Sequence, residues 1–256
     1  MHLLLDEQLA LKYKSNSQKA RVLTEDWILK NMYCPVCGNN VLIHFINNSP
    51  VADFYCEKCS EQYELKSING RIGSKIMDGA YQTFINRIQS SSNPNFLFMS
   101  YSMTQMTVQH LCFVPKFFFV PEMVEKRKAL GDHAKRAGWI GCNILFDHIP
   151  SQGKINIVHN GNIIDPNVVK QQVESATKIR MDNLTARGWL LDVLDCVNRI
   201  TNDVFTLQEV YQYEKILAKK YRNNQNIKAK IRQQLQVLRD KEMIEFCGNG
   251  LYCKRF

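Results

Sequence analysis

The chain lacks any apolar run that approaches the length of a membrane span, and it contains no internal repeat and no low-complexity tract. Residues 1–7 hold three leucines followed by two acids, which is too short an apolar stretch for a signal peptide. These absences argue against integral membrane, secreted and repeat proteins. We therefore expect a cytoplasmic location.

The composition is that of a globular protein with an excess of positive charge. Hydrophobic residues make up 45% of the 256 residues and charged residues 22%, so the chain can bury one large core or two smaller ones. Lysine and arginine outnumber aspartate and glutamate by 33 to 24, which gives a net charge of +9. This charge favours a polyanionic partner such as nucleic acid, although many basic proteins bind no anion.

Nine cysteines would suggest disulfides in a secreted protein, but their arrangement favours another use. The count is odd, and four of them form two Cys-x-x-Cys pairs, which in a reducing compartment indicate metal ligands or redox sites. The remaining five lie in apolar or strand-like segments, where we predict small buried thiols: Cys112, Cys142, Cys196, Cys247 and Cys253.

The two cysteine pairs have the spacing of a zinc ribbon. Cys34 and Cys37 are separated by 18 residues from Cys56 and Cys59, and each pair fits a tight turn whose sulfurs take adjacent corners of a tetrahedron. The alternatives are four free thiols or a thioredoxin-like redox pair. With four protein ligands the site is closed, so we predict a structural zinc, and we expect His44 to be an ordinary strand residue.

Residues 1–182 carry mixed helix and strand signals. We predict that Thr24 caps a helix over 24–32. Further helices are expected at 78–89 and 167–181, and strands at 41–46, 51–55, 62–67, 96–101, 108–120, 139–149 and 154–158. This pattern predicts an α/β or α+β domain with a mixed sheet.

From residue 183 the pattern changes to amphipathic helices. Helices are expected over 185–200 and 205–221, and a third has Ile227, Ile231 and Leu235 on one face. Gly248-Asn249-Gly250 lies between two strand-like runs and indicates a hairpin. We predict a winged helix-turn-helix domain over 183–256.

Three residues around the second cysteine pair suggest a metal-dependent nuclease. Asp53 is followed by Glu64 and Lys66, and because alternate strand residues face the same way, Glu64 and Lys66 point together. Two carboxylates provide hard ligands for Mg²⁺, and a lysine can orient the attacking water. The spacing also occurs by chance, in which case the residues form a solvated ion pair.

Polar side chains precede and begin the third C-terminal helix. Amides and cations at the start of a recognition helix suit base edges in the major groove. The predicted DNA-contacting residues here are Asn223, Asn224, Gln225, Asn226, Lys228 and Arg232, with Lys254 and Arg255 as phosphate partners. The alternative is a solvated face on a winged helix that binds protein.

The chain resembles PD-(D/E)xK nucleases, and in particular the methyl-directed type II restriction endonucleases. The resemblance is carried by Cys34-Pro35-Val36-Cys37, by Asp53 with Glu64-Leu65-Lys66, and by the tail 231–240. Pro50 stands two positions further from Asp53 than in the bare Pro-Asp pair.

The resemblance implies an enzyme, expected to be a monomer in solution, that cuts both strands of double-stranded DNA at GATC when its adenine carries an N6-methyl group. It also implies that Asp53 and Glu64 bind Mg²⁺, that the Leu65 carbonyl is a further ligand, and that Lys66 is the catalytic lysine.

A methyl group in the major groove requires an apolar contact, and Trp139 is our candidate reader. Lys135 and Arg136 precede it closely. The alternative is that Trp139 belongs to the core, as we expect of Trp27 and Trp189 on amphipathic helices.

Three functions remain open on the sequence alone. The first is an endonuclease for methylated DNA, and the second is a non-enzymatic DNA-binding regulator with a zinc ribbon and a winged helix. The third is a nuclease or repair factor for other nucleic acid structures. A regulator has no need for Asp53, Glu64 and Lys66.

Overall fold

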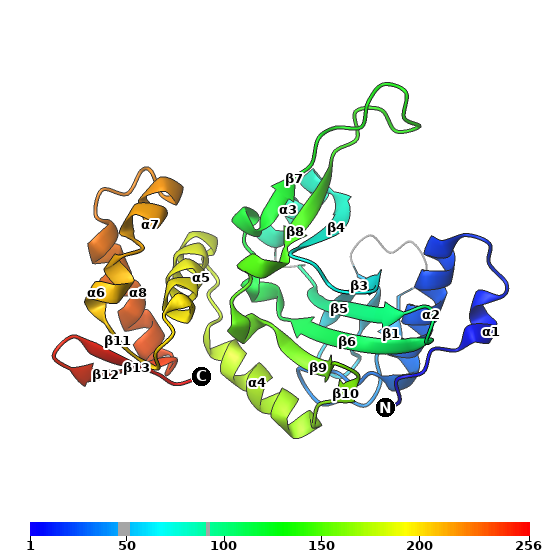
Figure 1. The fold of residues 1–256 in the computed structure, drawn as a ribbon, viewed down its shortest axis with the longest axis horizontal. Coiled ribbons are helices and arrows are strands. Elements are labelled where there is room, and N and C mark those ends of the chain that lie inside the picture. Colours follow the sequence, from blue (N-terminus) through cyan, green and yellow to red (C-terminus); the bar gives the residue numbers. More distant parts are fainter. Residues whose placement is uncertain (46–51, 91–92) are drawn as a thin grey trace.

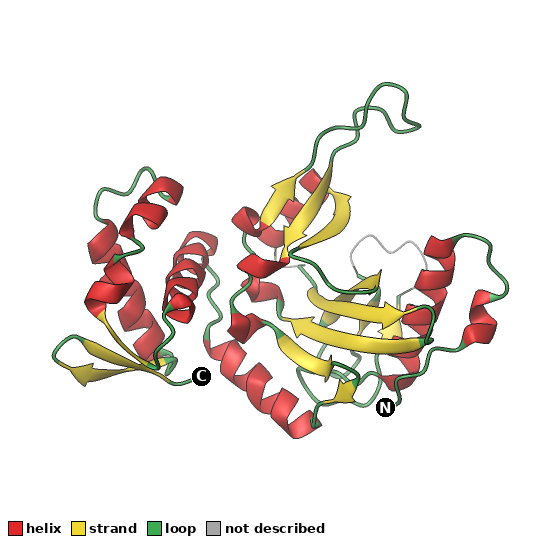
Figure 2. Ribbon diagram, viewed as in Figure 1, coloured by secondary structure: helices red, strands yellow, loops and turns green. Residues whose placement is uncertain are grey.

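The computed structural model describes residues 1–45, 52–90 and 93–256. Pro50, which carries part of the expected nuclease motif, lies outside the described residues. Figure 1 and Figure 2 show a larger N-terminal lobe with most of the strands and a smaller C-terminal lobe of helices and a hairpin. The predicted mixed α+β fold is confirmed.

A seven-stranded mixed sheet forms the centre of the larger lobe. Its order is β1-β2-β3-β5-β6-β9-β10, and β3 and β5 are parallel whereas the other neighbours are antiparallel. The strands are β1 (Ile43–His44), β2 (Phe54–Tyr55), β3 (Gln62–Asn69), β5 (Asn95–Ser102), β6 (Thr107–Val114), β9 (Ile155–His159) and β10 (Asn162–Ile163). Strand β5 is buried from Asn95 to Tyr101, and its nearly continuous apolar sequence suits a strand covered on both faces.

A second sheet of three antiparallel strands, in the order β4-β8-β7, stands beside the first. Its strands are β4 (Lys75–Ala80), β7 (Val124–Lys126) and β8 (Gly141–Leu145). The predicted helix from Asp78 is wrong at its start: residues 75–80 pair with β8, and α3 (Tyr81–Gln89) begins only where the apolar spacing of Phe84, Ile85 and Ile88 takes over. The loop 127–140 projects away from this sheet (Figure 1).

Helices flank the sheets and bury one face each. Helix α2 (Asn16–Asn31) packs against β3, and α4 (Pro166–Lys178) packs against β9. The remaining helical segments of this lobe are α1 (Glu7–Ala10) and the 3-10 turns η1 (Lys116–Phe118), η2 (Pro121–Met123), η3 (Phe146–His148) and η4 (Ser151–Gly153). The predicted strands over 108–120 and 139–149 therefore end earlier, at Val114 and Leu145.

Among the described residues no helix is long and apolar enough to cross a membrane.

The predicted cap at Thr24 is wrong, because helix α2 begins eight residues earlier, at Asn16. Thr24 is buried in the middle of the helix, where its hydroxyl donates a hydrogen bond to the Ala20 carbonyl at 2.8 Å. A threonine can satisfy its hydroxyl in this way inside a helix as well as at its start. Trp27 on the same helix is 1% exposed, which confirms its place in the core.

The smaller lobe is a helix-turn-helix domain with a three-stranded sheet, as predicted. Its elements are α5 (Leu184–Arg199), β11 (Val204–Thr206), α6 (Leu207–Tyr211), α7 (Glu214–Lys220), α8 (Ile227–Asp240), β12 (Ile244–Gly248) and β13 (Leu251–Lys254). The single helix predicted over 205–221 is wrong. Val204–Thr206 pair with β13, and Thr206 then caps α6 in a capping box with Glu209. Trp189 of α5 is 4% exposed and belongs to the core.

The predicted hairpin joins β12 to β13. Asn249 and Gly250 have φ angles of 50° and 73°, the left-handed values that such a tight turn requires.

The five further cysteines behave in two ways. Buried thiols are confirmed for Cys112, Cys142 and Cys196. The same prediction is wrong for Cys247 and Cys253, which form a disulfide across the hairpin because strand pairing brings their Cα atoms to 6.7 Å.

Candidate active site and metal centre

The four cysteines of the two Cys-x-x-Cys pairs form one cluster at the end of β2. Their sulfur atoms all lie within 4.8 Å of one another, and the Sγ pairs Cys34–Cys59 and Cys37–Cys56 are each 3.6 Å apart. A tetrahedron with metal–sulfur bonds of about 2.3 Å has edges of about 3.8 Å. The donor set and its dimensions therefore fit a zinc ion.

The two Cys-x-x-Cys pairs form separate backbone turns of the same type. The Gly38 N–H donates to the Cys34 carbonyl and the Ser60 N–H to the Cys56 carbonyl, each at 2.8 Å. Gly38 and Ser60 have φ angles of 73° and 59°. Two equivalent turns thus present two sulfurs each, which explains why the Cys-x-x-Cys spacing occurs twice.

Burial acts to raise the pKa values of Cys34 and Cys56, and hydrogen bonds act to lower them. Burial raises the pKa of the Cys34 thiol to about 11, although the buried Tyr63 hydroxyl, 2.9 Å from its sulfur, acts to lower it. Burial also acts to raise the pKa of Cys56, but the backbone N–H groups of Cys59 and Lys58 outweigh it and lower that pKa to about 7. Four thiolates in this space need a bound cation.

Strand pairing places Asp53 beside the residues predicted to act with it. The Asp53 N–H donates to the Tyr63 carbonyl at 2.9 Å, and the Asp53 carboxylate accepts a hydrogen bond from the Leu65 N–H at 2.7 Å. Burial raises the pKa of Asp53, the Leu65 N–H acts to lower it, and the carboxylate of Glu25 acts to raise it further.

Asp53, Leu65 and Lys66 line a cleft of about 720 Å³ between helix α2 and the second sheet. The α2 wall includes Arg21 and Glu25, which form an ion pair at 2.8 Å. The remaining lining residues are Ser17, Ala20, Thr24, Ser67, Ile68, Lys75, Ile76, Met77 and Asn143. The floor and walls of the cleft thus combine acidic and basic side chains.

Glu64 and Lys66 point to the same side of β3, as their alternation predicts. Lys66 Nζ lies 2.6 Å from Glu64 Oε1, and the other oxygen of Glu64 lies 2.9 Å from the Arg87 guanidinium. Lys66 also contacts the carboxylate of Asp78 on β4. Burial acts against the charge on Lys66, but the Glu64 and Asp78 carboxylates outweigh it and raise the pKa of the Lys66 ammonium.

Three residues of this neighbourhood were not predicted from the sequence. The sequence pattern places Asp78, Glu25 and Arg87 in helices and predicts no part in the site for any of them. Arg87 lies among Phe84, Ile85 and Ile88 on α3, so a single cation on an apolar helix face was the one available signal. His44 lies on β1, as predicted, and its Nε2 atom is 3.3 Å from the Glu25 carboxylate. It does not belong to the metal-binding cluster of the four cysteines.

The acidic residues also fit a hard divalent cation. Asp53 directly precedes β2 and Glu64 lies on the paired strand β3, so both offer carboxylate oxygens, and the Leu65 carbonyl belongs to the same short segment as Glu64. Mg²⁺ prefers oxygen ligands and keeps several of its waters. The chemistry of this donor set is therefore compatible with Mg²⁺.

The predicted residues of the 127–140 loop lie outside the core. Lys135 and Arg136 are exposed, and the Arg136 guanidinium lies 4.5 Å from the centre of the half-buried Trp139 ring. A side chain at Gly141 would collide with this ring at 2.8 Å, so Gly141 makes room for it. Trp139 thus lies at the base of the loop, in contact with Arg136 and close to the Gly141 backbone.

The amide-rich residues form the turn before α8. Asn223, Gln225 and Asn226 are exposed, and Asn224 accepts a hydrogen bond from the Asn226 N–H at 2.8 Å. They line a pocket of about 760 Å³ with Trp189 and Tyr221, whose rings stack at 3.7 Å.

Two cations of α8 share one neighbour. Lys228 and Arg232 are exposed and approach Tyr211: Arg232 donates to its hydroxyl at 2.7 Å, and the Lys228 ammonium lies 5.4 Å from its ring centre. Lys228 also lies 3.5 Å from Glu214.

The two cations predicted as phosphate partners on the hairpin have partners within the chain. Lys254 donates to the Ile200 carbonyl, and Arg255 contacts the Glu245 carboxylate. The exposed Arg255 is open to solvent, whereas Lys254 is half-buried. Of the two, Arg255 is better placed to meet a ligand.

Two family models together match nearly the whole chain. The model described as DpnI, Dam-replacing family, matches residues 1–182. The model described as DpnI_C, Dam-replacing HTH domain, matches residues 185–254.

Proposed function

This chain belongs to the DpnI, or Dam-replacing, family, and from that membership we propose that it is a type II restriction endonuclease acting on double-stranded DNA at GATC sites that contain N6-methyladenine. Family membership supports methyl-directed restriction in general. The site sequence, the cofactor and the catalytic residues are our proposal.

One observation carries the catalytic assignment. Asp53 and Lys66 line a single cleft, and Glu64 contacts Lys66 from the same strand face. A DNA-binding regulator has no use for an aspartate and a lysine in one cleft with a second carboxylate bound to that lysine. The arrangement favours hydrolysis of a phosphodiester held between helix α2 and the second sheet.

The proposed roles follow from the charge of each group. The raised pKa of Lys66 keeps it an ammonium at neutral pH, so it donates a hydrogen bond to the attacking water and offsets charge on the phosphate. The Leu65 N–H fixes the carboxylate of Asp53, and Arg87 restrains that of Glu64. Hydrolysis then leaves 5′-phosphate and 3′-hydroxyl ends.

Asp53, Glu64 and the Leu65 carbonyl would hold Mg²⁺. When bound, this ion stabilises negative charge that develops on the phosphate and lowers the pKa of a bound water. The four cysteines would hold a structural zinc, whose closed coordination leaves it no part in catalysis.

We assign residues 1–182 to the nuclease domain and 183–256 to a winged-helix DNA-binding domain. In the second, exposed amides before α8 and the cations Lys228 and Arg232 would contact DNA. In the first, Lys135, Arg136 and Trp139 would contact DNA near the methyl group.

The deciding experiment is cleavage of one plasmid, prepared with and without adenine methylation at GATC, in Mg²⁺ or in EDTA. We expect discrete fragments only from methylated DNA with Mg²⁺. Binding of methylated DNA without cleavage under any condition would indicate a DNA-binding regulator. Cleavage of branched substrates in preference to methylated duplex would indicate a repair nuclease.

Asp53→Asn should separate catalysis from binding. The amide keeps an oxygen that can accept from the Leu65 N–H but removes the negative charge, so we expect cleavage to fall by at least about 100-fold. Affinity for methylated duplex in Ca²⁺ should change by less than about 3-fold, which corresponds to under 1 kcal/mol. Equal loss of binding and cleavage would contradict the assigned role.

A further inference from the structure

Asp78 is a buried carboxylate next to the catalytic lysine, and it comes from a different sheet. It lies on β4, whereas Lys66 lies on β3 of the central sheet. Its side chain is only 5% exposed. One carboxylate oxygen accepts hydrogen bonds from Lys66 Nζ and from the Gly79 N–H, the latter at 2.6 Å.

The stability of the fold alone does not explain why a carboxylate is buried at position 78. Its second oxygen is buried and has no hydrogen-bond partner among the described residues. A buried charge with an unsatisfied oxygen costs free energy that one ion pair does not fully recover. An apolar side chain at position 78 would fill the same space at lower cost, so the carboxylate is better explained by what it does to Lys66.

Lys66 is held from two sides. Glu64 Oε1 lies 2.6 Å from its ammonium group, and Asp78 contacts the same group from β4. Arg87 lies 2.9 Å from the other oxygen of Glu64. The four side chains therefore form a row of alternating charge, in the order Asp78, Lys66, Glu64 and Arg87.

The two carboxylates differ in what they can do for the lysine. Glu64 is a proposed ligand of Mg²⁺, so its oxygens serve the cation as well. Asp78 is not part of that donor set, and its backbone is fixed by pairing with Cys142 on β8. An anchor that is independent of the metal ligands keeps the ammonium in one place while Glu64 changes partner.

We propose that Asp78 is a positioning residue that holds the Lys66 ammonium at the reacting phosphate. The proposal rests on the nuclease function proposed above. Asp78 acts through Lys66 and touches neither DNA nor metal. Its effect is therefore confined to the rate of the chemical step and is absent when Lys66 is absent.

The first test is Asp78→Asn in the full-length protein, measured by single-turnover cleavage of a methylated GATC duplex at saturating enzyme and Mg²⁺. The amide keeps a bond to the Gly79 N–H but loses the charge that holds Lys66. We expect the rate to fall about 10- to 100-fold, the loss typical of removing an outer-shell partner. The affinity for the same duplex in Ca²⁺ should stay within about 2-fold, because Asp78 does not contact DNA.

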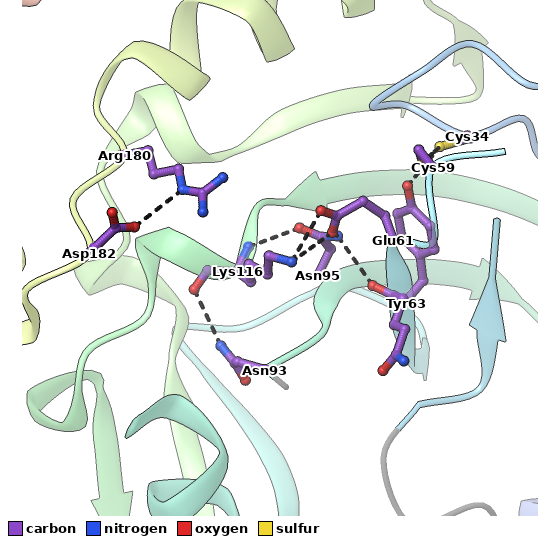
Figure 3. Close-up of polar contacts among 10 residues, drawn as sticks. Cys34, Cys59, Glu61, Tyr63, Asn93, Asn95, Lys116, Arg180 and Asp182 are labelled. Carbon is purple, nitrogen blue, oxygen red and sulfur yellow. Dashed lines mark hydrogen bonds and ion pairs between the residues drawn. The ribbon is translucent and has the colours of Figure 1, made fainter. Parts of the chain in front are cut away.

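Glu61→Gln is the matched control. Glu61 is a partly buried carboxylate in the same lobe that forms an ion pair with Lys116 at 3.0 Å (Figure 3), and neither residue lines the cleft. This variant loses a similar lysine–carboxylate pair and should cleave at the wild-type rate. A loss of rate in Glu61→Gln equal to that in Asp78→Asn would make the effect a general one of destabilisation and would overturn the proposal.

A double-mutant cycle with Lys66→Met tests whether Asp78 acts only through Lys66. We expect Asp78→Asn to cause no further loss of the residual rate in the Lys66→Met background. The double variant should also unfold at a higher temperature than the sum of the single changes predicts, because no unpaired charge remains. This thermal measurement needs no activity, and it serves as the test if Asp78→Asn alone folds poorly. Additive effects in both measurements would overturn the proposal.

The outcomes separate this inference from the proposed function. If the wild type cleaves methylated DNA and Asp78→Asn cleaves at the same rate, the positioning role is wrong and the nuclease function stands. If the wild type cleaves no DNA with Mg²⁺, the nuclease function and the positioning role both fail. Asp78→Glu keeps the charge and should recover part of the lost rate, which a purely structural role does not require.

Discussion

Tyr63 shows how closely the two chemical centres are connected at the level of single residues. Its hydroxyl lies 2.9 Å from the sulfur of Cys34, and its carbonyl accepts a hydrogen bond from the Asp53 N–H at 2.9 Å. The next residue is Glu64. One residue thus contacts the cysteine cluster by its side chain and the acidic pair by its backbone.

Tyr63→Phe should loosen the zinc centre without unfolding the protein. The phenyl ring keeps the buried packing, but the Cys34 thiolate loses a hydrogen-bond donor, and loss of such outer-shell partners weakens metal binding about 10- to 100-fold. We expect zinc to transfer to a chromogenic chelator at least about 10-fold faster than from the wild type. Tyr101→Phe removes the hydroxyl of another buried tyrosine, remote from the cysteines, and should leave the transfer rate unchanged.

At the scale of elements, the turn that carries Cys56 and Cys59 joins two paired strands. Cys56 and Cys59 lie in the connection from β2 to β3, between Asp53 and Glu64. The turn's hydrogen bonds, from the Cys56 N–H to the Glu61 carbonyl and from the Ser60 N–H to the Cys56 carbonyl, continue this pairing. Zinc is therefore expected to stabilise the strands that carry the proposed catalytic residues.

Cys56→Ser should accordingly unfold the N-terminal lobe or nearly so. Structural zinc contributes several kcal/mol to folding, so we expect the bound zinc to be lost and the melting temperature to fall by about 10 °C or more. Cys112→Ala is the control, because Cys112 is buried on β6 and lies outside the cluster. A stable, active Cys56→Ser variant would contradict the structural role of zinc.

Local patterns predicted several elements correctly, and distant contacts account for the errors. The two Cys-x-x-Cys turns, the alternation of Glu64 and Lys66 and the hairpin at residues 248–250 depend on neighbours in the sequence. Residues 75–80 became a strand because they pair with β8, more than 60 positions away, and this pairing also brings Asp78 to Lys66. No local periodicity encodes such a contact. The division of 205–221 has the same cause, since β11 forms only by pairing with β13.

At the scale of the whole molecule, polar contacts join the two lobes. Lys241 donates to the carbonyls of Lys178 and Arg180 at 2.7 and 3.0 Å, and the side-chain amides of Gln152 and Asn198 bond to each other at 2.9 and 3.0 Å. Arg187 on α5 donates to the Met181 carbonyl at 2.8 Å and to the Phe119 carbonyl at 3.4 Å. Hydrogen bonds to backbone carbonyls and between side-chain amides thus connect the two lobes.

Arg187→Ala should loosen this junction. It leaves the Met181 carbonyl without its donor, at a cost of about 1–3 kcal/mol, so the connection between α4 and α5 should open roughly 5- to 150-fold more often. Limited trypsin digestion at Arg180 should quicken by a similar factor. Arg199→Ala on the same helix removes only an exposed ion pair with Asp195 and should leave the digestion rate unchanged.

The position of the cysteine pairs also has a consequence for the order in which the chain folds. A metal ion bound by both cysteine pairs would close a loop of 18 residues between Cys37 and Cys56, so the conformational entropy lost on closure would be small. The parallel pairing of β3 with β5 encloses a longer segment that contains β4 and α3. We therefore expect metal capture and the β2–β3 pairing to form early and to serve as a template for the rest of the sheet, so that zinc raises the refolding rate as well as the final stability.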